Sequence, residues 1–313
     1  MLGWLAKGRS EQGWFVASVA ADELTYAHGQ HASGGKSLIT SYGARRLDGD
    51  KHALQKIAHE MRLAQYQCSA LLNQGEYQVV QVEAPSVPSD ELKSAIRWRI
   101  KDMIDYHIDD AAIDVLDIPP DEKGGNRSHF MYAVAARNDV IQACVRQFDE
   151  ARVPLSVIDI RETAQRNIAS LFETAERGVA LVYFAQDWGL LTINYRGELY
   201  LARKLDLGIK QLSSESATQD GGALERVAVE IQRTLDHFER QFRSIPVARV
   251  LVAPLPSDVG LGEFLHSRLG IESGQIDLSE VLAFHEPGGP DAETQWRFFH
   301  HYGAALRHET KEL

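Results

Sequence analysis

The chain has 313 residues, of which 44% are apolar and 25% charged, with a formal net charge of −11 and an isoelectric point near 5.6. This length and composition are ample for a buried core and suggest about two domains. The acidic balance argues against binding to nucleic acid and against direct adhesion to anionic lipid, because both depend on clustered Lys and Arg.

The two cysteines, Cys68 and Cys144, lack the spacing of a disulfide framework or a zinc site. The first residues contain no apolar segment of the kind found in signal peptides, and no apolar run approaches the roughly 20 residues of a membrane-spanning helix. We therefore expect a cytoplasmic protein that reaches a membrane only through a partner.

The first quarter of the chain alternates apolar and polar residues, which predicts strands interrupted by one amphipathic helix. The expected elements are a hairpin over 14–28 that turns at Ala21-Asp22, a strand over 37–47, a helix from Asp50, and strands over 68–72 and 76–85.

Residues 85–160 carry their own pattern of helix, strand, strand, helix and strand, which is typical of a compact inserted subdomain. Helical spacing in the first helix predicts that Ile100, Met103 and Ile104 face the core. The same spacing predicts an inward position for Val145 in the second helix.

The second half of the chain continues with strands and helices that resemble those of the first half. The expected elements are a helix from 161, an antiparallel meander over 178–207 with a turn at Arg196-Gly197, a long amphipathic helix over 223–242, a strand over 248–255, a helix ended by Gly270 and a terminal helix over 296–308. Strand meanders punctuated by helices, present twice, indicate an α/β protein of two similar halves.

Familiar catalytic patterns are incomplete. The segment that ends in Lys36 is similar to a phosphate-binding loop, but the first glycine of that motif is replaced by Gln30 and no helix is expected after the lysine. His300 and His301 are adjacent, so on a helix they point about 100° apart and cannot share a metal ion. The sequence therefore predicts no metal site and no catalytic residues.

Four colinear segments carry a resemblance to a known family. They are residues 94–118, residues 132–160, Glu230-Ile231-Gln232-Arg233 within the helix over 223–242, and the closing Gly303-x-Ala305-Leu306-Arg307. Together they are similar to the actin-like PilM family of type IV pilus assembly proteins, and within it to MshI, the biogenesis protein of the mannose-sensitive haemagglutinin (MSHA) pilus.

The resemblance implies an actin-like ATPase fold of the FtsA/PilM type, with two lobes and an inserted α+β subdomain. Residues 1–84, 161–176 and 293–313 would form lobe 1, residues 85–160 the inserted subdomain, and residues 177–292 lobe 2.

Actin-fold ATPases hold phosphates with backbone amides at two hairpins whose first strands end in Asp-x-Gly. The first of these turns reads Ala20-Ala21-Asp22 here, and the second has Phe184 and Gln186 where Asp and Gly are expected. The adenosine-binding Gly-Gly is replaced by Pro254-Leu255-Pro256, and proline has no amide to donate.

These departures predict a degenerate ATPase that is not an enzyme and needs no cofactor. In the alternative, a diverged ATPase of the PilM type still binds ATP and Mg²⁺, and Asp187 and Gly208 are then its best remaining contacts.

The resemblance also implies a partner: the cytoplasmic N-terminal tail of an inner-membrane protein of the PilN kind, which the chain would connect to the motor ATPase. With this partner the chain would be peripheral at the inner membrane. In the family such a tail binds between the main lobe and the inserted subdomain. The corresponding wall would include Ile104, Tyr106 and Ile108, for which core packing is an equally good interpretation. A further alternative is the cytoplasmic part of a secretion protein of the GspL type.

Overall fold

The computed structural model describes residues 13–20, 22–31, 35–49, 52–121, 129–174, 176–214 and 222–307. The contacts divide the chain into two units. Unit 1 comprises the described residues of Met1–Tyr26 and Ala44–Arg161, and unit 2 those of Ala27–Gly43 and Glu162–His308. Residues 85–160 thus lie within unit 1, and the three-part division expected from the sequence stays a prediction.

The strands are β1 (Trp14–Ala20), β2 (Glu23–Gln30), β3 (Leu38–Arg46), β4 (Gln67–Leu71), β5 (Tyr77–Glu83), β6 (Ala111–Asp117), β7 (Phe130–Arg137), β8 (Leu155–Asp159), β9 (Gly178–Phe184), β10 (Gly189–Tyr195), β11 (Glu198–Leu205), β12 (Val247–Val252), β13 (Glu272–Gln275) and β14 (Ala283–Phe284). The helices are α2 (Ala53–Glu60), α3 (Leu92–Ile100), α4 (Asn138–Glu150), α5 (Arg161–Ser170), α6 (Ile209–Leu212), α7 (Ala223–Gln241), α8 (Leu261–Leu269) and α9 (Ala292–Ala305).

The strands form three sheets, with the orders β14-β3-β2-β1-β4-β8, β11-β10-β9-β12-β13 and β5-β7-β6. Strands β1, β4 and β8 pair in parallel, so their carboxyl ends meet at one edge. A parallel pair needs a long crossover connection, and the one from β4 to β8 passes through the three-stranded sheet and returns through α4. This edge positions the candidate site described below.

The core of unit 1 lies between these parallel strands and their helices. Helix α2 buries Leu54, Ile57 and Ala58, at the helical spacing that the sequence indicates, and α4 contributes Phe148. The remaining buried members of the cluster are Phe15, Ala17, Leu24, Tyr26, Leu63, Cys68, Ala70, Ala151 and Val153. Burial of this apolar surface supplies the main stabilisation of the unit.

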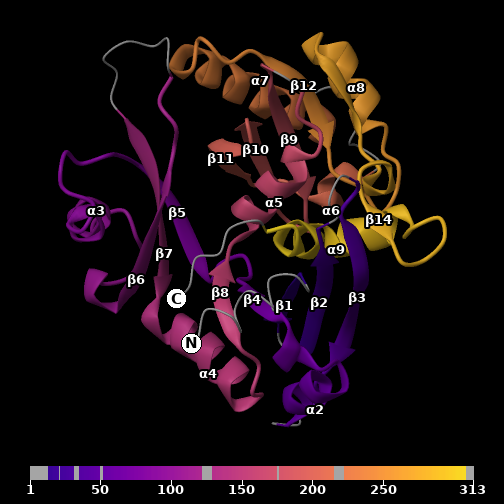
Figure 1. The fold of residues 1–313 in the computed structure, drawn as a ribbon. Helices are drawn as coiled ribbons and strands as arrows, with labels where there is room; N and C mark the ends of the chain where they lie inside the picture. The colour runs from indigo at the N-terminus through magenta and orange to yellow at the C-terminus, as the bar shows by residue number, and fades with distance from the viewer. Residues whose placement is uncertain are drawn as a thin grey trace. The chain divides into compact units, whose positions relative to one another are not determined.

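In Figure 1, α3 lies beside the three-stranded sheet β5-β7-β6. Ile96 and Ile100 are fully buried in the cluster beneath the helix. The inward position expected for Met103 is wrong, because α3 ends at Ile100 and the Met103 side chain is 51% exposed. The inward position of Val145 is also wrong: α4 is covered on one side only, and Val145 lies on its exposed side.

The meander of unit 2 confirms the expected order of strands. Arg196 and Gly197 both have positive φ, 53° and 76°, as the two-residue turn of a tight hairpin requires. Helix α7 buries the apolar stripe seen in the sequence, and Gly270 in the left-handed conformation ends α8. Among the described residues, no helix is both long and apolar enough to cross a membrane.

Candidate functional site

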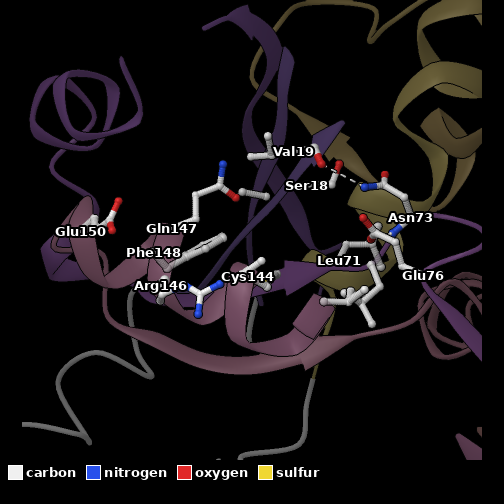
Figure 2. A pocket seen from close by; sticks show the side chains of 15 residues that line it. Ser18, Val19, Leu71, Asn73, Glu76, Cys144, Arg146, Gln147, Phe148 and Glu150 are labelled. Atoms are coloured by element: carbon white, nitrogen blue, oxygen red, sulfur yellow. Dashed lines mark hydrogen bonds between the residues drawn. The ribbon is translucent and has the colours of Figure 1, made fainter. Parts of the chain in front are cut away.

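A pocket of about 470 Å³ lies in unit 1, where the carboxyl ends of the parallel strands β1 and β4 face α4 (Figure 2). We call it the α4 pocket. It is lined by Ala17, Ser18, Val19, Ala70, Leu71, Leu72, Asn73, Glu76, Val140, Ala143, Cys144, Arg146, Gln147, Phe148 and Glu150. Its size is that of a typical ligand site, and the carboxyl edge of parallel strands is where open α/β sheets bind ligands.

Helix α4 supplies one wall of this pocket. Val140, Ala143, Cys144 and Gln147 line it at spacings of three and four residues, so they form one stripe along the helix. Because Ala143 has a short side chain, the stripe is hollow at its centre. The sequence indicates this face through its periodicity, but periodicity does not distinguish a face that packs on a core from one that borders an open pocket.

The opposite wall is a loop tied to the end of β1. The Asn73 side-chain amide donates to the Val19 carbonyl at 3.0 Å, and the Asn73 backbone N–H donates to a Glu76 carboxylate oxygen at 2.6 Å. These bonds hold the Glu76 carboxylate at the pocket. No basic side chain of the described residues forms an ion pair with it.

The Cys144 thiol lies within the field of that carboxylate. Burial, and after it the negative charge of Glu76, raises the pKa of Cys144 to about 11. The thiol therefore stays protonated at neutral pH and acts as an apolar part of the pocket wall.

The residues that the resemblance assigns to partner binding lie elsewhere in unit 1. Ile104 is buried in the cluster beneath α3, and Tyr106 and Ile108 pack against the same cluster. The guanidinium of Arg137 lies 5.9 Å from the Tyr106 ring centroid, and burial raises the pKa of the Tyr106 hydroxyl. None of the three lines the α4 pocket. Their role in partner binding stays a prediction.

The structure brings together the two residues named for the alternative of ATP binding. Gly208 precedes α6 and lies against the turn between β9 and β10, so a Cβ there would be 2.6 Å from the Asp187 amide nitrogen. Asp187 forms an exposed ion pair with Lys210 at 2.7 Å. Both candidates therefore belong to one turn–helix junction of unit 2.

The backbone amides at this junction already have partners. The N–H groups of Ile209 and Lys210 donate to the carbonyls of Ala185 and Gln186, at 2.8 and 3.1 Å. The Gly208 N–H donates to the Gln211 side chain at 3.0 Å. The first turn of α6 is thus used to close the β9–β10 turn.

The structure also describes parts of the other two positions where the sequence departs from the ATPase pattern. In the first hairpin, the Asp22 carboxylate accepts the Gly49 N–H at 2.9 Å, while Ala21 lies outside the described residues. After β12, Pro254 and Leu255 are buried.

A second pocket, of about 640 Å³, lies in unit 2 between the end of β11 and α7. We call it the β11–α7 pocket. Its lining is mostly charged: Arg203, Lys204, Leu205, Asp206, Leu207, Glu225, Arg226, Val227, Val229, Glu230 and Arg233. Glu230 pairs with Arg203 at 2.5 Å and with Arg233 at 3.2 Å.

No protein-family model matches the chain, and no curated protein matches its sequence. Among solved structures, it is similar to a chain of the PilM–PilN type IV pilus biogenesis complex, with 17% identity over 95% of this chain and 97% of that one and a TM-score of 0.65. It is also similar to the cytoplasmic domain of EpsL, an inner-membrane component of the type II secretion system of Vibrio cholerae, with 14% identity, 91% and 94% coverage and a TM-score of 0.47.

A third similar structure is a Bacteroides thetaiotaomicron protein of actin-like ATPase fold and unknown function, with 10% identity, 96% and 99% coverage and a TM-score of 0.46. The likeness to the PilM–PilN chain extends over nearly the whole of both chains and confirms the expected fold class. The chain has an actin-like α/β fold.

Proposed function

We propose that the chain is a non-catalytic scaffold of type IV pilus assembly or of a related secretion machine. In this role it holds an extended segment of a membrane-bound partner in the α4 pocket. The observation that carries the proposal is the pocket itself, which is open, half apolar and placed at the carboxyl ends of β1 and β4.

The position of the pocket supports a partner of the PilN kind. The resemblance to PilM implies a partner tail that binds between the main lobe and the inserted subdomain. The α4 pocket lies between α4, which belongs to the expected inserted subdomain, and β1 and β4, which belong to the expected lobe 1. A chain of the same fold comes from a complex of PilM with PilN. We include in the same proposal that the chain is an MSHA-type protein and links its partner to a motor ATPase at the inner membrane.

Loss of nucleotide binding is the second part of the proposal. Phosphate recognition in this fold needs free backbone amides, whereas the amides of Ile209 and Lys210 donate to carbonyls of the protein. Titration calorimetry with millimolar MgATP should therefore show no binding. Binding in the micromolar range, or ATP hydrolysis, would refute this part and leave the partner site untouched.

The partner site is tested with a pair of variants on α4. Ala143→Trp fills the hollow of the stripe, while Val145→Trp adds the same side chain on the exposed side of the helix. The immobilised wild-type chain and the Val145 variant should retain an inner-membrane pilus or secretion protein from detergent-solubilised membranes, identified by mass spectrometry, and the Ala143 variant should not. Equal retention by both variants would contradict the proposal, as would retention of no such protein by the wild type.

The β11–α7 pocket supports a second candidate function, the binding of an anionic ligand such as a nucleotide. Four cationic side chains line it, and for Lys204 and Arg226 no acidic partner is found among the described residues. If calorimetry detects MgATP, Arg226→Ala should weaken that binding. An unchanged affinity would place the nucleotide elsewhere.

A further inference from the structure

The Glu76 carboxylate sets the chemistry of the α4 pocket. It is half-buried and lines a pocket whose lining includes Leu71, Leu72, Val140 and Phe148. Within the described ranges it has no cationic partner, and the Asn73 N–H is the group that the structure shows donating to it. A carboxylate in this position keeps part of its hydration only while the pocket is open.

An occupant that fills the pocket removes that hydration. Burial of an uncompensated carboxylate is strongly unfavourable, so a purely apolar segment would lose much of what its burial gains. A segment that brings a positive charge to Glu76 avoids this cost and adds a charge-assisted hydrogen bond. The net charge of −11 on the whole chain favours the approach of a cation in addition.

The second acidic side chain of the pocket does not serve the same purpose. Figure 2 shows Glu150 at the end of the pocket opposite Glu76. Glu150 lies on the exposed last turn of α4, in a lining that also holds the exposed Arg146. The charge near Cys144, which raises the pKa of that thiol, is the charge of Glu76.

We propose that the α4 pocket selects an extended segment in which a positive charge, bound by Glu76, stands next to an apolar side chain packed against α4. The inference rests on the proposed function, because it describes the occupant of the same pocket. The positive charge can come from a Lys or Arg side chain or from a free α-amino group, since all three are N–H donors of the same charge.

The test uses a random peptide library displayed on phage with free N-termini and selected on the immobilised full chain. Selection on the Ala143→Trp variant in parallel removes peptides that bind elsewhere. We expect the remaining peptides to carry a Lys, an Arg or an apolar first residue whose α-amino group serves as the cation. Synthetic versions separate the sources: acetylation of the N-terminus abolishes binding through the α-amino group, and norleucine in place of Lys abolishes binding through the side chain.

Glu76→Gln is the decisive variant. Glutamine keeps an oxygen that can accept the Asn73 N–H, so the loop and the fold are preserved, which thermal unfolding verifies. The selected peptides should bind this variant about tenfold more weakly or worse, and their binding should no longer weaken with added salt. Glu150→Gln serves as the matched control and should change affinity less than about twofold.

Three outcomes would overturn the inference. Synthetic peptides that still bind in a pocket-dependent way after acetylation of the N-terminus and replacement of every Lys and Arg would show that a neutral segment is preferred. An unchanged affinity of Glu76→Gln would show that the carboxylate is not the contact. Both results leave the proposed function standing. If no selected peptide is sensitive to Ala143→Trp, the pocket holds no extended segment, and the proposed function fails together with the inference.

Discussion

Substitution of Gly208 by Ala tests the closed turn in unit 2 directly. The backbone of Gly208, at φ −134° and ψ −169°, is extended and accessible to any residue, so the cost of an added methyl group is steric. The new Cβ would lie 2.5 Å from the Gln186 carbonyl oxygen and 2.6 Å from the Ala185 carbonyl oxygen. Both neighbours are backbone atoms, which cannot rotate away as a flexible side chain can.

Relief of this clash must separate the turn from α6. The movement weakens the two hydrogen bonds by which Ile209 and Lys210 donate to the carbonyls of the turn. Such bonds contribute about 0.5–1.5 kcal/mol each, and an overpacked site costs about 1–3 kcal/mol. We therefore expect Gly208→Ala to lower the free energy of unfolding by about 2–4 kcal/mol.

Urea unfolding followed by tryptophan fluorescence measures the loss, and Trp296 is a suitable reporter because its indole N–H donates to the Phe184 carbonyl at the end of β9. Gly274→Ala is the matched control, since a Cβ at that strand position meets no atom within 4 Å. It should change stability by less than about 1 kcal/mol. If the two variants are equally stable, α6 is not docked on the turn, and the amides of its first turn are free for a phosphate.

Two further predictions concern unit 1. Ile100→Ala should lower the free energy of unfolding by about 2–4 kcal/mol, because the side chain is fully buried. Trp98→Ser should change it by less than about 1 kcal/mol, because Trp98 is 71% exposed. Equal losses of stability in urea unfolding would contradict the described packing of α3. Since the pKa of Cys144 is raised to about 11, its alkylation by iodoacetamide should be slow at pH 8 and accelerate as the pH rises towards 11. Glu76→Gln removes the negative charge and should lower the pKa of Cys144, so alkylation at pH 8 should be faster. Mass spectrometry measures the alkylation rate, and an unchanged rate would show that the carboxylate is not close to the thiol.

Much of the fold could be predicted because local chemistry determines it. The Arg196-Gly197 turn has a glycine at one of its two positions of positive φ, and Gly270 ends α8 in the left-handed conformation. The stripe of α7 repeats over 19 residues, long enough for its period to be unambiguous. In α3, by contrast, the apolar spacing continues past Ile100, where the helix ends, so Met103 was expected on the wrong face.

The candidate site was harder to predict because its parts are distant in the sequence. Glu76 lies in a loop after β4, and Cys144 lies on a helix that packs on the same sheet through Phe148. Neither residue belongs to a motif, and only the tertiary fold brings them together. The small side chain of Ala143 within an otherwise larger stripe is the one local signal that indicates a hollow.

Both parts of the proposal depend on which polar groups of the protein already have partners. A phosphate bound by the amides of Ile209 and Lys210 would have to displace the carbonyls that accept from them, and those carbonyls would then need water or other donors. Charge-assisted bonds are roughly twice as strong as neutral ones, but part of that gain is cancelled because Asp187 places a negative charge beside the turn and neutralises Lys210. Phosphate binding by these two amides thus requires the junction to open. The α4 pocket needs no such rearrangement: its hollow is present and Glu76 lacks a cationic partner within the described ranges, so a cationic segment can bind without breaking a bond of the fold.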